Sequence, residues 1–257
     1  MSHRDPRKSA CSRRAVLRAG LAGLLGLALP WRARAFGETS QLVFAVVDHP
    51  GDPNPRPTAL RRLAWEVVKR TSIEAKLESR LLSLSDPQIF YHPLLVLAGR
   101  DAFPPFDERS VASLRRHLTY GGLLFVDSAE GDLGSPFDQS VRRLLERALP
   151  GAKVEPVPRK HVLYKSFYLL DEPSGRVLRR PYLSSVVLDD RLAVVYSHND
   201  LMGAWARDDL GMWEYDVDPR QREMAFRLGV NLVMYAMCLD YKDDQVHLPF
   251  ILKRRKS

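Results

Sequence analysis

The stretch GGLLFVDS at residues 121–128 joins the end of a predicted helix to a buried strand. Upstream, Asp107 can cap a helix whose apolar positions share one face, namely Val111, Leu114 and Leu118. The glycine pair ends that helix. Leu123–Val126 then follows without polar alternation, which is typical of a parallel strand covered by helices on both faces. The stretch therefore predicts one helix-to-strand unit of an α/β sheet.

Three further apolar runs have the same character, and they are Leu42–Val47, Leu94–Ala98 and Leu192–Tyr196. Helical spacing predicts helices from Phe137 to Ala148, from Met224 to Leu239, and after a capping Thr58 with Leu60, Leu63, Ala64, Val67 and Val68 inward. Turn residues at Asp189-Asp190 predict a hairpin region between Lys153 and Asp190. This alternation indicates a doubly wound, mostly parallel sheet with helices on both faces.

The first 35 residues have the anatomy of a signal peptide. A basic start that contains Arg13 and Arg14 resembles the twin-arginine signature. The apolar run Ala19–Leu29 is shorter than the roughly 20 residues that a membrane-spanning helix needs. An Ala-x-Ala pattern predicts cleavage after Ala35. We therefore expect the twin-arginine translocase as an export partner, a periplasmic or secreted location, no stable transmembrane span after cleavage, and one domain over residues 36–257. The alternative is an amphipathic first helix, but no helical stripe is present.

The charge of the chain depends on the leader. The full sequence carries a formal net charge of +8 at pH 7, but removing the eight basic residues and one acid of the leader leaves 31 basic against 30 acidic residues. This balance argues against nucleic-acid binding. Cys238 alone remains after cleavage, so no internal disulfide forms, and its apolar helical run predicts a buried position. No glycine-rich phosphate loop and no cysteine cluster is present, so we expect no cofactor.

Polar side chains follow the predicted strands where each of them ends. Ligands of open parallel sheets bind beyond the carboxyl ends of the strands. The expected ligand-binding residues at these ends are Asp48, His49, Asp127, Glu130 and Asn199. The alternative is that they are helix caps and turn formers, which strand-to-helix loops also require.

Ser128 stands at a sharp strand-to-helix turn, where α/β hydrolases hold their nucleophile. In a serine hydrolase, His198 would be its base and Asp200 the acid that orients the histidine. The glycines that usually flank such a nucleophile are absent.

Two other chemistries use the same strand ends. A divalent metal held by Asp48, His49, Asp127 and His198 lacks any HxH or HExxH spacing, so we predict no metal site. The other chemistry is the binding of a polar ligand such as a glycan or peptide. Trp205 and Trp213 would supply aromatic faces for it. Elsewhere, His117 is predicted on a helix surface and His161 in a structured loop.

Several strings of the chain resemble domain-of-unknown-function family 4159, and they include Asn54–Leu63, His92-Pro93, Gly121–Asp127, Asn199–Leu201 and Phe226–Asn231. The resemblance covers nearly the whole chain after the leader. It implies a flavodoxin-like fold similar to that of class I glutamine amidotransferases.

An amidotransferase of that fold would carry a cysteine at the elbow and a His-x-Glu after a later strand. Here Asp127-Ser128-Ala129 offers no cysteine, whereas His198-Asn199-Asp200 is similar to the His-x-acid half. Serine peptidases of related fold keep Ser128 a candidate. The resemblance thus favours a non-catalytic or degenerate amidotransferase-like domain that binds a polar ligand or an envelope partner, with a serine hydrolase using Ser128 and His198 as the alternative.

Overall fold

The computed structural model describes residues 41–254, with side chains described up to residue 237. Seven strands form one mixed, mostly parallel sheet in the order β2-β1-β3-β4-β7-β6-β5. They are β1 (Ala45–Val47), β2 (Arg80–Leu82), β3 (Leu94–Gly99), β4 (Leu123–Ser128), β5 (Glu155–Pro156), β6 (Ser184–Leu188) and β7 (Arg191–Ser197). Only the pairings β5–β6 and β6–β7 are antiparallel. This arrangement confirms the predicted α/β class and is consistent with a doubly wound, flavodoxin-like fold.

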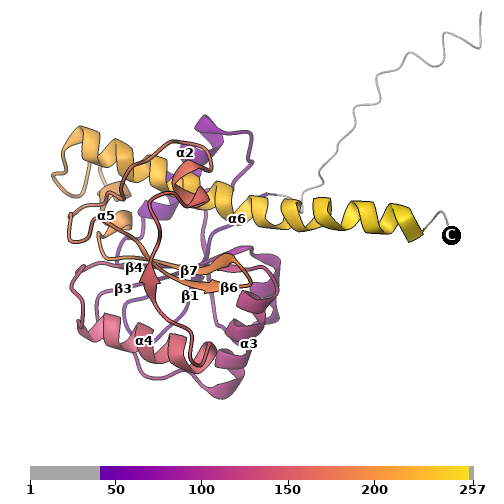
Figure 1. Ribbon diagram of the computed structural model, residues 1–257. Helices are drawn as coiled ribbons and strands as arrows, with labels where there is room; N and C mark the ends of the chain where they lie inside the picture. The colour runs from indigo at the N-terminus through magenta and orange to yellow at the C-terminus, as the bar shows by residue number, and fades with distance from the viewer. Residues whose placement is uncertain (1–40, 255–257) are drawn as a thin grey trace, which may run out of the picture. The chain divides into compact units, whose positions relative to one another are not determined.

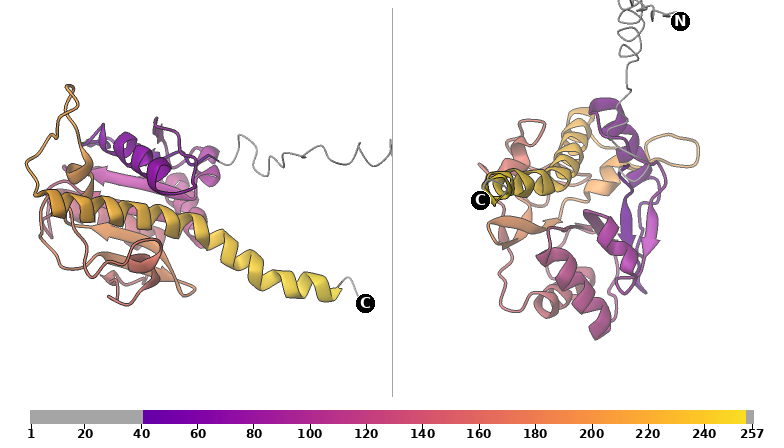
Figure 2. Two further views of the ribbon diagram at one scale, coloured as in Figure 1. Left: turned by 90° about the horizontal axis from the view of Figure 1, so that it is seen from above. Right: turned by 90° about the vertical axis from the view of Figure 1, so that its right-hand side faces the viewer.

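Helices cover both faces of the sheet (Figures 1 and 2). One face carries α2 (Ala59–Arg70), α5 (Leu201–Trp205) and α6 (Pro219–Arg254), which contact one another. The other face carries α3 (Glu108–Thr119) and α4 (Pro136–Ala148). Two short 3-10 helices, η3 (Pro87–Tyr91) and η4 (Val162–Lys165), lie in the connections.

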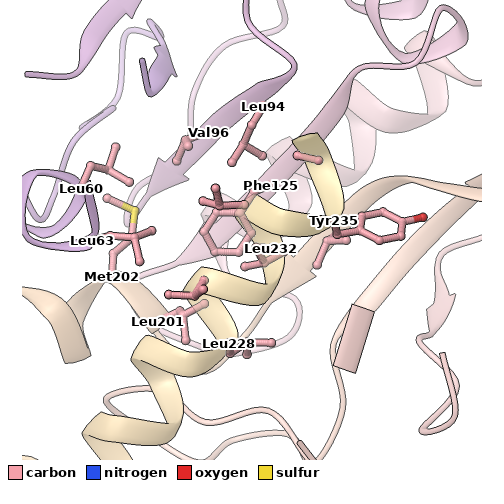
Figure 3. Close-up of a cluster of buried hydrophobic side chains, with 14 of the residues drawn as sticks. Leu60, Leu63, Leu94, Val96, Phe125, Leu201, Met202, Leu228, Leu232 and Tyr235 are labelled. Carbon is pink, nitrogen blue, oxygen red and sulfur yellow. The ribbon is translucent and has the colours of Figure 1, made fainter. Parts of the chain in front are cut away.

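Alternate residues of the central strands pack into two separate hydrophobic cores, one on each face of the sheet. In β3, Leu94 and Val96 face the α2–α5–α6 layer, whereas Leu95 and Leu97 face the α3–α4 layer. Figure 3 shows the first core, in which β3 and Phe125 of β4 meet leucines of α2, α5 and α6. Because both faces are buried, these strands have no polar alternation in the sequence.

The four apolar runs predicted as strands are confirmed as parts of β1, β3, β4 and β7, with shifts of a few residues at their ends. The Asp107 cap is confirmed, since its carboxylate accepts the Ser110 amide at 2.7 Å. A β6–β7 hairpin turns at Asp189-Asp190, and both residues have positive φ. The predicted region, residues 153–190, therefore contributes β5 and β6, which pair antiparallel with their neighbours.

Three local predictions are wrong. Thr58 precedes α2 but makes no side-chain cap. Its hydroxyl instead donates to the Arg207 carbonyl at 2.7 Å and accepts the Arg207 amide at 2.8 Å. His117 is only 4% exposed rather than on the surface, because its ring lies against Gly122, which has no Cβ to keep it out.

Val68 was predicted to face inward with Val67, yet it is about half exposed at the end of the apolar stripe. The predicted leader, with Arg13, Arg14 and the cleavage position after Ala35, lies outside the described residues, as does the side chain of Cys238. Within the described part of the chain, no helix combines the length and apolar character needed to cross a bilayer.

Candidate functional site

The parallel register brings the predicted site residues to one edge of the sheet. Asp127 lies opposite Ala98 of β3 and Ser197 of β7, and Ser128 lies opposite Gly99. From the end of β1, His49 contacts the Ala98 carbonyl through Nε2 at 2.8 Å. Polar residues that are distant in the sequence therefore share one small region at the carboxyl ends of four strands.

Two carboxylates at this edge hold the start of α5. Asp127 accepts the amides of Leu201 at 2.9 Å and Met202 at 2.7 Å. Asp200, in the left-handed conformation, accepts the third amide, that of Gly203, at 3.0 Å. The first three amides of this short helix, which have no partner within the helix, are thereby satisfied.

Two arginines balance the buried charge of Asp200. Arg56 binds both carboxylate oxygens, with Nη2 at 2.8 Å and Nε at 3.4 Å. Arg176 forms a second ion pair with the same carboxylate and also donates to the Ala129 carbonyl at 3.1 Å. The ring of Tyr215 lies under both guanidinium groups, at 4.6 and 5.0 Å from ring centre to guanidinium carbon. Asp200 is therefore the centre of a buried, paired network (the Asp200 network: Arg56, Asp127, Arg176, Asp200 and Tyr215).

Asp127 has no arginine partner of its own among the described residues. Burial raises the pKa of Asp127, and repulsion from Asp200 raises it further. The amides of Met202 and Leu201 oppose this shift by hydrogen-bonding the carboxylate. A perturbed carboxyl group is one mark of a functional site, but here its hydrogen bonds give it a capping role.

Ser128 and His198, the predicted nucleophile and base, are each engaged elsewhere. Ser128 is fully buried, and its Oγ accepts the Gly131 amide at 3.1 Å. The Nε2 of His198 faces Asp138 of α4 at 3.4 Å. Among the described residues, no hydrogen bond joins the side chains of Ser128, His198 and Asp200. The catalytic assignment of these residues stays a prediction, and the geometry gives each of them another contact.

The acid that does face His198 is Asp138, which the sequence did not single out. Burial alone would raise the pKa of Asp138, but hydrogen bonds from His198, Arg142 and the Gly134 amide outweigh burial and hold this pKa far below its usual range. The Nδ1 atom of His198 is buried without a hydrogen-bond partner in the described part of the chain. The ring packs on Tyr196 with a separation of 4.0 Å between ring centres.

Asn199 and His49 hold loops in place. The Oδ1 atom of Asn199 accepts the amides of Arg179 at 2.9 Å and Arg180 at 2.8 Å. Its Nδ2 donates to the Arg180 carbonyl at 2.8 Å. The Nδ1 atom of His49 accepts the Gly51 amide at 3.2 Å, and burial lowers the pKa of its ring. A neutral His49 with Nε2 protonated satisfies both of its contacts.

Two predicted ligand-binding residues are exposed. Asp48 follows β1 at the surface, and Glu130 forms an ion pair of 3.3 Å with Arg100 in which both side chains are about half exposed. Trp205, by contrast, is fully buried against Phe226 and cannot contact a ligand. Over residues 41–237, no group of three or more His, Cys, Asp and Glu side chains is placed to hold a metal ion.

The sequence did not single out either arginine of the Asp200 network. Arg56 is separated from Asp200 by 144 positions and Arg176 by 24. The available signal for Arg56 is its place before Pro57, because a following proline restricts the backbone of Arg56 to extended conformations.

The chain was compared with models of known protein families. A family model described as Domain of unknown function (DUF4159) matches residues 43–237. The chain belongs to this family. In this DUF4159 domain, the matched range contains all the strand-end residues described above, together with Arg56, Arg176 and Asp138. No curated protein matches the chain.

Proposed function

We propose that this DUF4159 protein is an exported, non-catalytic domain that binds an envelope protein at the carboxyl edge of its sheet. The observation that supports this most directly is the use of the strand-end carboxylates inside the fold. Asp127 and Asp200 together accept three backbone amides and two arginines. These contacts give both carboxylates a role inside the fold, because they cap α5 and Asp200 also neutralises Arg56 and Arg176.

The burial of Ser128 argues in the same direction. A nucleophile needs an accessible oxygen and a base within hydrogen-bond reach. Ser128 is 0% exposed and accepts a backbone amide, whereas the nearest hydrogen bond of His198 goes to Asp138. The edge thus has the sharp turn of a hydrolase without its working contacts.

The partner protein would then be recognised by charged side chains at the surface of the same edge. Asp48 is exposed, Glu130 is paired with exposed Arg100, and Asp132 is 3.6 Å from exposed Arg179. Such exposed charges suit the polar rim of a protein interface, where they set orientation and partner choice. The predicted leader would bring this surface to the periplasm.

Labelling with a fluorophosphonate probe tests the non-catalytic part. We expect intact-mass analysis of the mature chain from Phe36 to show no adduct. A single adduct that is lost in Ser128→Ala would overturn the proposal and establish a serine hydrolase.

Site-specific photo-crosslinking in cells tests the binding surface. A photoreactive residue at Asp132 is expected to capture one envelope protein, whereas the same residue at exposed Glu78, which precedes β2 at the opposite edge, is not. Asp48→Asn combined with Glu130→Gln is expected to weaken that crosslink at least about fivefold, as the loss of interface charges predicts. Equal crosslinking at both positions, or no effect of the double substitution, would refute the surface.

Export is tested by replacing Arg13 and Arg14 with lysine and following the protein through cell fractions. Retention of the variant in the cytoplasm, with the unaltered chain in the periplasm, is the expected result. Periplasmic accumulation of the variant would contradict the twin-arginine route.

A further inference from the structure

A cleft of about 600 Å³ lies between α2, the loop that joins α5 to α6, and the first turns of α6. The loop spans residues 206–218 and is orange in Figure 2. The side chains that shape the cleft include Arg62, Arg70, Trp213, Tyr215, Arg222 and Phe226. Its volume is in the range of small-molecule sites, roughly 300–1,000 Å³.

Arginines and aromatic rings alternate in the walls of this cleft. The guanidinium carbon of Arg222, in the wall, lies 4.0 Å from the centre of the Trp213 ring, and that of Arg207, which does not line the cleft, lies 3.7 Å from it. Arg62 lies 5.7 Å from the same ring and 5.8 Å from the Phe226 ring. Trp213 is 36% exposed, so its ring is within reach of a ligand.

The arginines at this cleft are only partly paired with carboxylates. Two of its three carboxylates are paired with arginines of α2, because Glu66 binds Arg62 at 2.5 Å and Arg70 at 2.6 Å, and Glu223 binds Arg70 at 2.8 Å. The third, Asp216, forms no ion pair among the described residues. Arg207 and Arg222 have no ion pair within the described residues. Arg222 donates instead to backbone carbonyls, among them that of Ala204 at 2.7 Å.

The electrostatics of these two arginines reflect that lack of a partner. Burial lowers the pKa of Arg207, and the charge of Arg62 lowers it further. Burial and then the charge of Arg207 have the same effect on the pKa of Arg222. Asp208 and Asp216 act in the opposite direction without reversing either shift. An anion bound here would reduce the repulsion among three guanidinium groups.

We propose that the cleft binds a small aromatic anion, a carboxylate or phosphate attached to a planar ring. The ring lies against Trp213 and Phe226, and the anionic group contacts Arg62 and Arg222. Arginine presents a planar set of donors that matches carboxylate and phosphate oxygens, and aromatic faces bind planar rings by offset or edge contacts. This site differs from the exposed charges of the proposed protein-binding edge, although Tyr215 of the Asp200 network also lines it.

Calorimetric titration of the mature chain with four probes separates the two parts of this recognition. Naphthalenecarboxylate and phenyl phosphate each combine a ring with an anion, hexanoate lacks the ring, and naphthalenemethanol lacks the charge. We expect both aromatic anions to bind at one site, and hexanoate and naphthalenemethanol to bind at least about tenfold more weakly. Comparable affinity for naphthalenemethanol and naphthalenecarboxylate would overturn the proposal.

Substitutions place the binding in the cleft. Arg62→Gln and Trp213→Leu are each expected to weaken naphthalenecarboxylate binding at least about fivefold, because each removes a charge or a ring from the wall. Arg61→Gln, at an exposed neighbour on the same helix, is the matched control and is expected to leave affinity unchanged. Thermal unfolding of each variant checks that it folds. Unchanged affinity in folded Arg62→Gln and Trp213→Leu would place the binding elsewhere and refute this site.

Discussion

Asp200→Asn is expected to lower the free energy of unfolding by about 3–5 kcal/mol, because it leaves buried arginines without a counter-charge. Asp200 is 0% exposed and Arg56 3% exposed, and their closest atoms are 2.8 Å apart. Arg176 also loses its carboxylate, although its side chain is 26% exposed and water compensates it in part.

Asparagine isolates the charge from the other roles of Asp200. The residue has φ of +48°, a left-handed conformation that asparagine tolerates better than most residues. The amide oxygen of asparagine can still accept the Gly203 amide, so the cap on α5 is kept. The expected loss of stability therefore comes mainly from unpaired positive charge.

Urea unfolding of the mature chain at pH 7 measures the effect, with Asp132→Asn as the control. Asp132 has an exposed partner at 3.6 Å, so its replacement is expected to change stability by less than about 0.5 kcal/mol. Adding Arg56→Met to Asp200→Asn is expected to recover at least about 1 kcal/mol relative to the sum of the single changes. A loss below about 1 kcal/mol in Asp200→Asn, or strict additivity in the pair, would refute the account of the network.

Three further predictions concern stability. Burial holds the pKa of His117 at about 4, below the unfolded value of about 6.5. The free energy of unfolding is therefore highest above pH 6.5 and falls by about 3 kcal/mol as pH drops toward 4, because the unfolded state binds the proton more readily. An NMR titration midpoint of His117 near 6.5 would contradict this. Gly131→Ala is expected to cost about 2 kcal/mol or more in urea unfolding, since φ is +77° and a Cβ would lie 2.4 Å from the His198 carbonyl oxygen; a loss below about 0.5 kcal/mol would count against it. Asp190→Gly is expected to raise stability by about 1 kcal/mol, because φ of +63° is strained for aspartate; an unchanged or lower thermal midpoint would count against that strain.

The elements that the sequence predicted share a local origin. A strand buried on both faces must be apolar at every position, so β3 and β4 are visible as uninterrupted runs. A helix cap such as Asp107 bonds an amide three residues away, so both partners lie in one short window. β2 was missed because it is a three-residue edge strand with two exposed side chains, and its position depends on pairing with β1.

The candidate site divides in the same way. The sequence determined that Asp127, Ser128, His198 and Asp200 lie at the ends of neighbouring strands, because parallel strands end at a common edge. It could not determine what these side chains bind, since that depends on groups brought in from elsewhere.

Only the tertiary structure decided that Asp200 pairs with Arg56 and Arg176, and that His198 faces Asp138. The gathering of three arginines around Trp213 is likewise visible only once α2, the loop of residues 206–218 and α6 are packed together. The physical reason is the distance along the chain over which each interaction acts. Backbone periodicity and capping act over a few residues, whereas the charge balance of a buried group is set by whatever the folded chain places within a few ångströms of it.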